Sequence, residues 1–178
     1  MNKSVLLIVD VQKALVKKGP YNEDKVIDNI KKLISAARSN EKEVIYICHD
    51  DGKGEELEKG TDGWQVYDDV APNKNERVFD KEYNSAFHKT DLKEYLDSKG
   101  INTIILVGLQ TEYCIDATCK SAFDNGYKII IPEGTNTTFS NEYLPGEKLY
   151  EFYNYKIWNK RFANVIPLDE VISNLEDN

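Results

Sequence analysis

Three residues with complementary chemistry, Asp10, Lys81 and Cys114, each follow an apolar run that is typical of a β-strand. Asp10 ends the run LLIVD, Lys81 follows RVFD, and Cys114 stands shortly after INTIILVGL. A thiol becomes a strong nucleophile when a base takes its proton, and a nearby ammonium stabilises the anions that form. These three residue types at one site therefore predict attack by the thiol on an amide-type carbonyl.

Each of the three residues also has a structural interpretation when it is considered alone. An aspartate at a strand end often caps the following turn, and this is as well supported for Asp10 as a role as base. Lys81 stands among charged residues, which is typical of a solvated surface lysine. A cysteine at a helix start is weak evidence by itself, so a purely structural Cys114 is an even alternative. The hypothesis depends on the three residues lying together.

The two cysteines in VGLQTEYCIDATCKSAFDNGY are predicted to differ. Thr111 is the predicted N-cap of a helix, and Glu112 in its first turn favours the helix dipole. Cys114 then lies in the first helical turn, where unpaired N–H groups and the dipole lower the pKa of a thiol. Cys119 falls on the apolar stripe of the same helix, so we interpret it as a small buried core residue.

The chain alternates apolar runs with amphipathic segments. Nearly continuous Val/Ile/Leu runs predict buried parallel strands, and two weaker candidates are Arg77–Asp80 and Ala163–Pro167. The four strong runs are Ser4–Asp10, Glu43–His49, Ile101–Leu109 and Tyr127–Pro132. Helical periodicity covers a segment that ends near Asn40, then Thr90–Ser98 and Glu112–Asn125.

Strands that alternate with helices predict an α/β fold, with a doubly wound, mainly parallel sheet and helices on both faces, as in Rossmann-like proteins. We expect one domain over residues 1–178. Ligands of such sheets bind outside the carboxyl ends of the strands. The Gly-rich and charged segment Asp50–Asn75 is too long for a tight turn, and it is predicted to cross that edge of the sheet as a lid.

Composition and charge argue against several classes of function. The formal net charge of -8 and the pI near 4.9 disfavour non-specific binding to nucleic acid or to an anionic membrane. No stretch is long and apolar enough for a membrane span, and the first apolar run is too short for a signal peptide. Three cysteines without disulfide-scaffold spacing suit a reducing compartment, so we expect a cytoplasmic protein.

Three motifs occur in a specific order: IVDVQ, a lysine four residues before SAFHKTDL, and GLQTEYC at the start of a helix. Together they resemble the isochorismatase-like cysteine hydrolases, and the resemblance covers nearly the whole chain. It implies the fold of that family and a catalytic triad of Asp10, Lys81 and Cys114. Lys81 is favoured over Lys89 because it precedes the Ser-Ala-Phe segment.

The resemblance also implies how the reaction proceeds and what it needs. Backbone N–H groups of Gln110 and Cys114 would hold the oxyanion, with a non-proline cis peptide between Leu109 and Gln110. Asp10 would protonate the leaving amine and then activate water to hydrolyse a thioester. The expected substrate is a small molecule with a non-peptide C–N bond, such as an amide or a ureide, and no cofactor is expected.

Departures from the family pattern narrow the expected activity. The metal-dependent relatives, the nicotinamidases, carry an Asp-x-His and further histidines after the second strand, whereas this chain has His49 there and His88 elsewhere. We therefore expect no metal site, and we interpret His49 as a strand-end residue bonded to a turn in preference to a substrate contact. Enzymes that hydrolyse isochorismate typically lack the cysteine. The region after the second strand resembles the metal-free branch that includes streptothricin-hydrolase-like amidases.

Aromatic residues are the remaining candidates for binding. The candidate substrate contacts are Trp64, Tyr83, Phe87 and Tyr113, although aromatic side chains in such positions are more often plain packing. The aromatic and basic segment YNYKIWNKRFANVI is expected to form an interface of a homo-oligomer, a dimer or a tetramer, or else to close the core as a C-terminal helix.

Two other interpretations of the function stay open. One is isochorismatase or another hydrolase of the same fold. The other is a non-catalytic protein that binds a small ligand at the edge of the sheet. No glycine-rich phosphate-binding pattern follows any predicted strand, which argues against a nucleotide as that ligand.

Overall fold

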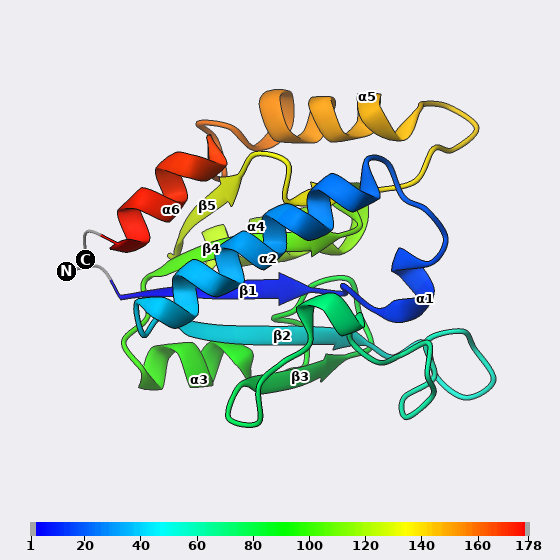
Figure 1. Ribbon diagram of the computed structural model, residues 1–178, viewed down its shortest axis with the longest axis horizontal. Coiled ribbons are helices and arrows are strands. Elements are labelled where there is room, and N and C mark those ends of the chain that lie inside the picture. Colours follow the sequence, from blue (N-terminus) through cyan, green and yellow to red (C-terminus); the bar gives the residue numbers. More distant parts are fainter. Residues whose placement is uncertain (1–2, 177–178) are drawn as a thin grey trace.

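The computed structural model describes residues 3–176, and within this range seven parallel strands form one sheet. The strands are β1 (Ser4–Val9), β2 (Glu43–His49), β3 (Arg77–Lys81), β4 (Thr103–Leu109), β5 (Lys128–Pro132), β6 (Asn136–Thr137) and β7 (Asn164–Ile166). Their order is β3-β2-β1-β4-β5-β7, and β6 pairs with β4 (Figure 1). All six predicted strands are present, whereas the two-residue β6 was not predicted.

Helices cover both faces of the sheet (Figure 1). The helices are α1 (Lys13–Val16), α2 (Glu23–Ser39), α3 (Leu92–Ser98), α4 (Asp116–Asp124), α5 (Gly146–Glu151) and α6 (Leu168–Glu176). Leu6 and Ile8 of β1 pack in one core with α2 and α6, and Leu7 and Val9 pack in the other core with α3 and α4. Because successive strand residues point to opposite faces, this alternation confirms the predicted doubly wound sheet.

The chain reverses its direction of travel across the sheet between β1 and β4. From β1 it proceeds outward through β2 to β3, and it then crosses over to β4 on the other side of β1. The carboxyl ends of two such neighbouring strands diverge into a crevice, which is where ligands bind in open α/β sheets. Asp10 follows β1, and the π-helical turn η2 (Thr111–Ile115) follows β4, so both reach this crevice.

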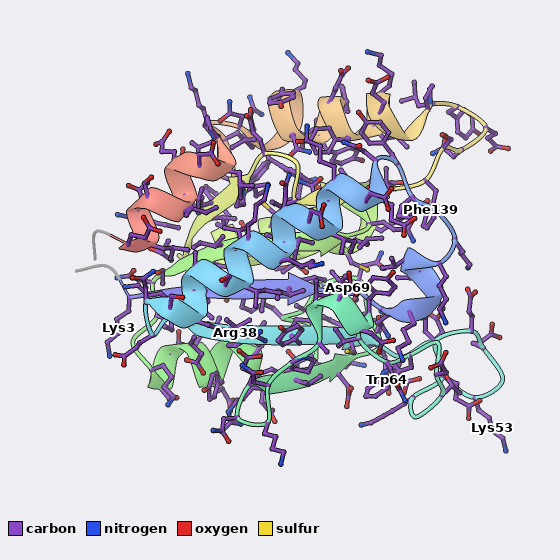
Figure 2. The ribbon with its side chains drawn as sticks, viewed as in Figure 1. Lys3, Arg38, Lys53, Trp64, Asp69 and Phe139 are labelled. Atoms are coloured by element: carbon purple, nitrogen blue, oxygen red, sulfur yellow. The ribbon has the colours of Figure 1, made fainter. Side chains whose placement is uncertain are left out.

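The segment Asp50–Asn75 begins beyond the carboxyl ends of β1 and β2, where it is fastened to the chain after β1, and then returns along α2 to the amino end of β3. Backbone hydrogen bonds join it to residues 11–14, and its side chains Leu57 and Val70 are buried. Figure 2 shows Lys53 at the outer end of the segment and Trp64 closer to the strand ends. The segment thus crosses the predicted edge of the sheet, and its opening and closing as a lid stay a prediction.

The C-terminal third combines packing with exposed aromatic surface. Trp158, at the end of the π-helical turn η3 (Phe152–Trp158), is fully buried, whereas Phe152 and Tyr155 are about half exposed. The segment therefore closes the core in part, and its use as an interface between subunits stays a prediction. No helix among residues 3–176 combines the length and the apolar character that a membrane crossing requires.

Gly108 allows β4 to approach β1 where the crevice begins. Its φ is +126°, and a Cβ added there would lie 1.9 Å from the carbonyl oxygen of Val9. The backbone of Val9, the last residue of β1, cannot move aside cheaply, since β1 is buried on both faces. Only glycine fits this position, one residue before the Leu109–Gln110 peptide and opposite the residue that precedes Asp10.

We expect Gly108→Ala to lower the free energy of unfolding by roughly 3 kcal/mol, because the methyl group clashes with Val9 and the positive φ is unfavourable. Gly126→Ala is the matched control, since Gly126 has a φ of +87° and no atom within 4 Å of an added Cβ. Its loss should be about 1 kcal/mol. Urea unfolding measures both losses, and equal losses would contradict the steric explanation.

Candidate active site

Asp10, Lys81 and Cys114 meet at the carboxyl ends of β1, β3 and β4. Lys81 Nζ lies 2.7 Å from Asp10 Oδ2 and 3.2 Å from Cys114 Sγ. Asp10 and Lys81 are almost fully buried, whereas Cys114 keeps some exposure. The three residues thus lie together as the hypothesis required, and their catalytic roles stay a prediction.

The Asp10 carboxylate has unused capacity to accept a proton. Its contact with Lys81 has the distance of an ion pair, but its angles are not those of a hydrogen bond. Neither carboxylate oxygen has a hydrogen-bond partner among the described residues. A buried carboxylate that is compensated only by an adjacent ammonium retains free lone pairs, and this arrangement suits a general base.

His49 is a fourth member of the cluster that the sequence did not identify. Its Nδ1 lies 2.8 Å from Lys81 Nζ, and its Nε2 lies 2.9 Å from Asp51 Oδ1. An ammonium can only donate, so His49 Nδ1 is the acceptor and the imidazole proton stays on Nε2, facing Asp51. The expected hydrogen bond between His49 and a turn accounts for only part of its contacts, because its ring also reaches Lys81.

The register of the sheet explains why this contact was missed. His49 and Lys81 are the last residues of β2 and β3, and they are paired partners in the parallel register of these strands. Partners in register point to the same face of a sheet, so the two side chains are neighbours. The sequence gives both strand ends but no register, and 31 residues separate them (49 to 81). No local signal in the chain indicates that the two side chains touch.

Gln12, in the motif IVDVQ, holds the end of β2 in place. Its fully buried amide accepts a hydrogen bond from the backbone N–H of His49 at 2.9 Å. The same amide donates to the carbonyl oxygens of His49, at 2.9 Å, and Trp64, at 2.8 Å. These bonds replace strand pairing at a point where β1 has ended. Gln12 is therefore a supporting residue of the site, and only its position in the motif could have indicated it.

The position of the Lys81 ammonium disfavours a metal ion at this site, and the absence of a metal stays a prediction. Ligand atoms of Asp10, His49 and Cys114 lie within 4.8 Å of one another, which is a spacing that a metal could bridge. Lys81 Nζ, however, lies 2.7, 2.8 and 3.2 Å from these same atoms. A metal bound to all three at about 2.0–2.3 Å would sit beside the ammonium and be repelled by it. The positive charge that these ligands bind is that of Lys81.

The surroundings of Cys114 correct the expectation of a lowered thiol pKa. The pKa of Cys114 is raised to about 12, first by burial and then by the Asp10 carboxylate, while Lys81 opposes the rise. The expected N-cap at Thr111 is also wrong, because Thr111 is buried within the π-helical turn and its hydroxyl donates to Asn136 Oδ1 at 2.8 Å. The chain enters the helix through a turn wider than an α-helix, so the assumed dipole geometry does not apply.

The backbone around the thiol has the predicted isomer. The Leu109–Gln110 peptide is cis, as the family resemblance implied. The carbonyl oxygen of Gln110 accepts from the N–H groups of Tyr113 and Ile115, each at 3.1 Å. The use of the Gln110 and Cys114 N–H groups as an oxyanion hole stays a prediction.

The four aromatic candidates lie in different environments. The indole Nε1 of Trp64 is buried and has no partner among the described residues. Tyr113 is half exposed beside Cys114. Tyr83 and Phe87 border a hollow of about 430 Å³ against α4, and none of the three catalytic candidates lines it. Substrate contact stays a prediction for all four, and it has the least geometric support for Tyr83 and Phe87.

Comparison with known proteins assigns the fold and the motifs to a family. A family model described as the isochorismatase domain matches residues 4–166. The chain belongs to the isochorismatase family. The crystal structure of an isochorismatase family protein aligns with a TM-score of 0.86 and 26% identity, and the alignment covers 93% of this chain and 99% of that one.

Two curated relatives of this isochorismatase-family protein are hydrolases by name. Streptothricin hydrolase from Streptomyces noursei is 29% identical over 143 residues, which are 79% of this chain and 57% of that protein. N-carbamoylsarcosine amidase from an Arthrobacter species is 25% identical over an alignment of 197 positions that covers 98% of this chain and 72% of that protein. The chain spans little more than half the length of the first relative.

The charges around Cys114 predict opposite effects of two substitutions on its alkylation by iodoacetamide. Because the raised pKa keeps the thiol protonated, the rate should increase with pH well above neutrality. Asp10→Asn removes a charge that raises the pKa of Cys114, so alkylation at a fixed pH should become faster. Lys81→Met removes the charge that lowers this pKa, so alkylation should become slower.

The rates are measured by mass spectrometry of the peptide that contains Cys114 between pH 7 and pH 10. Cys119 serves as the internal control, because it is buried and its pKa is also raised to about 12, first by burial and then by Asp116, so neither substitution should change its rate. If the alkylation rate of Cys114 changed in the same direction in both variants, the electrostatic coupling of the cluster would be contradicted.

Proposed function

We propose that this isochorismatase-family protein is a cysteine hydrolase that cleaves a non-peptide C–N bond of a small amide or ureide through a thioester intermediate. The single observation that carries the proposal is the contact of the Lys81 ammonium with both the Asp10 carboxylate and the Cys114 sulfur. A carboxylate, an ammonium and a thiol this close together support the proposal, because the thiol proton would have only a short distance to move to Asp10. The name of one curated relative, N-carbamoylsarcosine amidase, agrees with cleavage of a C–N bond, and the name of another, streptothricin hydrolase, agrees with hydrolysis of a small molecule.

The proposed acylation begins at the thiol. Asp10 takes the proton of Cys114 while the sulfur attacks the substrate carbonyl, and Lys81 stabilises the negative charge on the sulfur. The carbonyl oxygen becomes an oxyanion, held by the backbone N–H groups of Gln110 and Cys114. Asp10 then gives its proton to the leaving nitrogen as the C–N bond breaks. The products of this half-reaction are a free amine or ammonia and a thioester on Cys114.

The proposed deacylation uses the same groups in the reverse order. Asp10 takes a proton from a water molecule, and the hydroxide that forms attacks the thioester carbonyl. The C–S bond breaks, the carboxylic or carbamic acid leaves, and the proton on Asp10 returns to the sulfur. The cycle consumes one water and needs neither an oxidant nor a metal, because Cys114 supplies the nucleophile and Lys81 the positive charge.

We expect Cys114→Ala to abolish turnover, a loss of at least about 1000-fold, because no other group replaces the nucleophile. Cys119→Ala is the matched control: Cys119 is a fully buried residue of the core around α4, so its loss should affect stability by about 1 kcal/mol and leave the chemistry nearly intact. The measurement is ammonia release from a panel of small amides and ureides.

Three results would count against this assignment. Equal losses in the two cysteine variants would show that the cysteines are assigned wrongly. Turnover by Cys114→Ala would remove the thioester mechanism. Hydrolysis of isochorismate in place of every amide tested would favour the vinyl-ether reaction of the same fold.

Metal removal gives a separate test. Because the Lys81 ammonium occupies the space between the candidate ligands, activity should survive exhaustive treatment with EDTA. Ammonia release is compared before treatment, after treatment, and after addition of zinc, iron or manganese. Activity that disappears with EDTA and returns with one of these metals would overturn the metal-free mechanism.

A further inference from the structure

The Lys81 ammonium lies against three groups, and the mechanism above uses only two of them. Asp10 supplies an ion pair and Cys114 an acceptor, and His49 Nδ1, at 2.8 Å, supplies a second acceptor. We propose that His49, oriented by Asp51, is a positioning residue that holds the ammonium against Cys114 and Asp10. This inference rests on the proposed cysteine hydrolase function and adds two residues to the site that performs it.

A lysine needs such an acceptor because its own side chain does not fix the position of its charge. Four rotatable bonds separate the ammonium from the backbone, so its location depends on the groups that it contacts. The side chain of Lys81 has no exposed surface, so water is not at hand to replace a lost contact. A buried N–H without an acceptor is costly, and the ammonium would turn to find another partner.

His49 is itself held at both its backbone and its ring. Gln12 bonds to its N–H and its carbonyl oxygen, each at 2.9 Å, and these bonds fix where the side chain begins. Asp51 Oδ1, 2.9 Å from His49 Nε2, fixes the rotation of the ring and keeps the proton on that nitrogen. The Nδ1 lone pair is therefore directed at Lys81. A carboxylate–histidine pair used in this way orients its target, as such pairs orient ligands of metals.

The contacts favour positioning over the other uses of a histidine at this place. A ring with both nitrogens occupied, one by Lys81 and one by Asp51, has no free atom for a substrate hydrogen bond. Its side chain is also mostly buried, with 15% of its surface exposed. A metal would have to displace the ammonium, as argued above. The remaining consequence of the contact is to place the charge that stabilises the Cys114 thiolate.

The alkylation rate of Cys114 tests this directly, because it reports the stability of the thiolate without a substrate. Iodoacetamide is uncharged, so changes in rate reflect the thiol and not attraction of the reagent. His49→Leu removes the hydrogen-bond acceptor and replaces the imidazole with an apolar side chain of similar bulk. His49→Asn keeps an acceptor, since its Oδ1 lies at the same distance along the side chain as Nδ1. His88→Leu, at an exposed position, is the control for loss of an imidazole.

The expected result is a graded series at each pH between 7 and 10. His49→Leu should slow alkylation of Cys114 by roughly tenfold or more, the effect of losing one hydrogen bond to a charged group. His49→Asn should stay within about twofold of the unmodified protein, and Asp51→Ala should slow the reaction by about two- to threefold. His88→Leu should leave it unchanged. With a substrate in hand, His49→Leu should lower kcat and change KM little.

Two outcomes would overturn the proposal. One is a His49→Leu variant that folds normally, as judged by circular dichroism and thermal unfolding, and alkylates at the original rate. The other is a His49→Asn variant that is as impaired as His49→Leu, which would show that the acceptor is not what matters. If His49→Leu does not fold, Asp51→Ala decides, because Asp51 is 40% exposed and its replacement leaves the core intact. An unchanged rate in that variant would overturn the role given to the pair.

These outcomes are separate from failure of the proposed function. The function fails if Cys114→Ala retains turnover or if no amide or ureide is cleaved, and neither result changes the alkylation series. The positioning role fails if the series is flat, even in an enzyme that hydrolyses amides through Cys114.

Discussion

The structure of this site depends on one buried ammonium. Burying a charge costs several kcal/mol unless it is paired and hydrogen-bonded, and Lys81 has no exposed side-chain surface. Its three partners come from three places: Asp10 after β1, His49 at the end of β2, and Cys114 in η2 after β4. None of these is near Lys81 in the sequence. The charge is therefore compensated only when the strand order β3-β2-β1-β4 is complete, so the fold and the site are formed together.

Residues that take no part in the proposed reaction, together with the backbone conformation of Asp10, bring these groups within contact distance of Lys81. Gly108 lets β4 lie against the backbone of Val9, which brings the turn that carries Cys114 close to Asp10. Gln12 binds the last residue of β2 where strand pairing has ended. Asp10 itself has a φ of +53°, in the left-handed region, which aspartate tolerates better than most residues. The conformation turns the chain sharply at the end of β1.

The sequence predicted the strands well and the contacts between them poorly, for physical reasons. β2 was predicted with its observed bounds, because a strand buried on both faces reads as a continuous apolar run. β3 was predicted one residue short, since Lys81 is a charged residue buried at its end. The sequence predicted an α-helix where the wider π-helical turn η2 is found. One extra residue per turn does not detectably change the spacing of apolar residues in so short a segment. Three residues of the site followed from motif order, but His49 depended on strand register, which only the folded sheet defines.

The cluster also explains how a thiol with a raised pKa can serve as a nucleophile. At rest the Asp10 carboxylate, the Lys81 ammonium and the Cys114 thiol carry no net charge as a group. When the proton moves from sulfur to carboxylate, the charges become those of a neutral acid, an ammonium and a thiolate, and their sum is still zero. Loss of the same proton to solvent would leave a net negative charge in a buried site, and the raised pKa of Cys114 reflects the cost of that route. Because Lys81 contacts both atoms between which the charge moves, it stabilises the state before the transfer and the state after it. In the proposed mechanism the thiol therefore stays protonated until it attacks a substrate carbonyl, and its reactivity depends on the position of the ammonium.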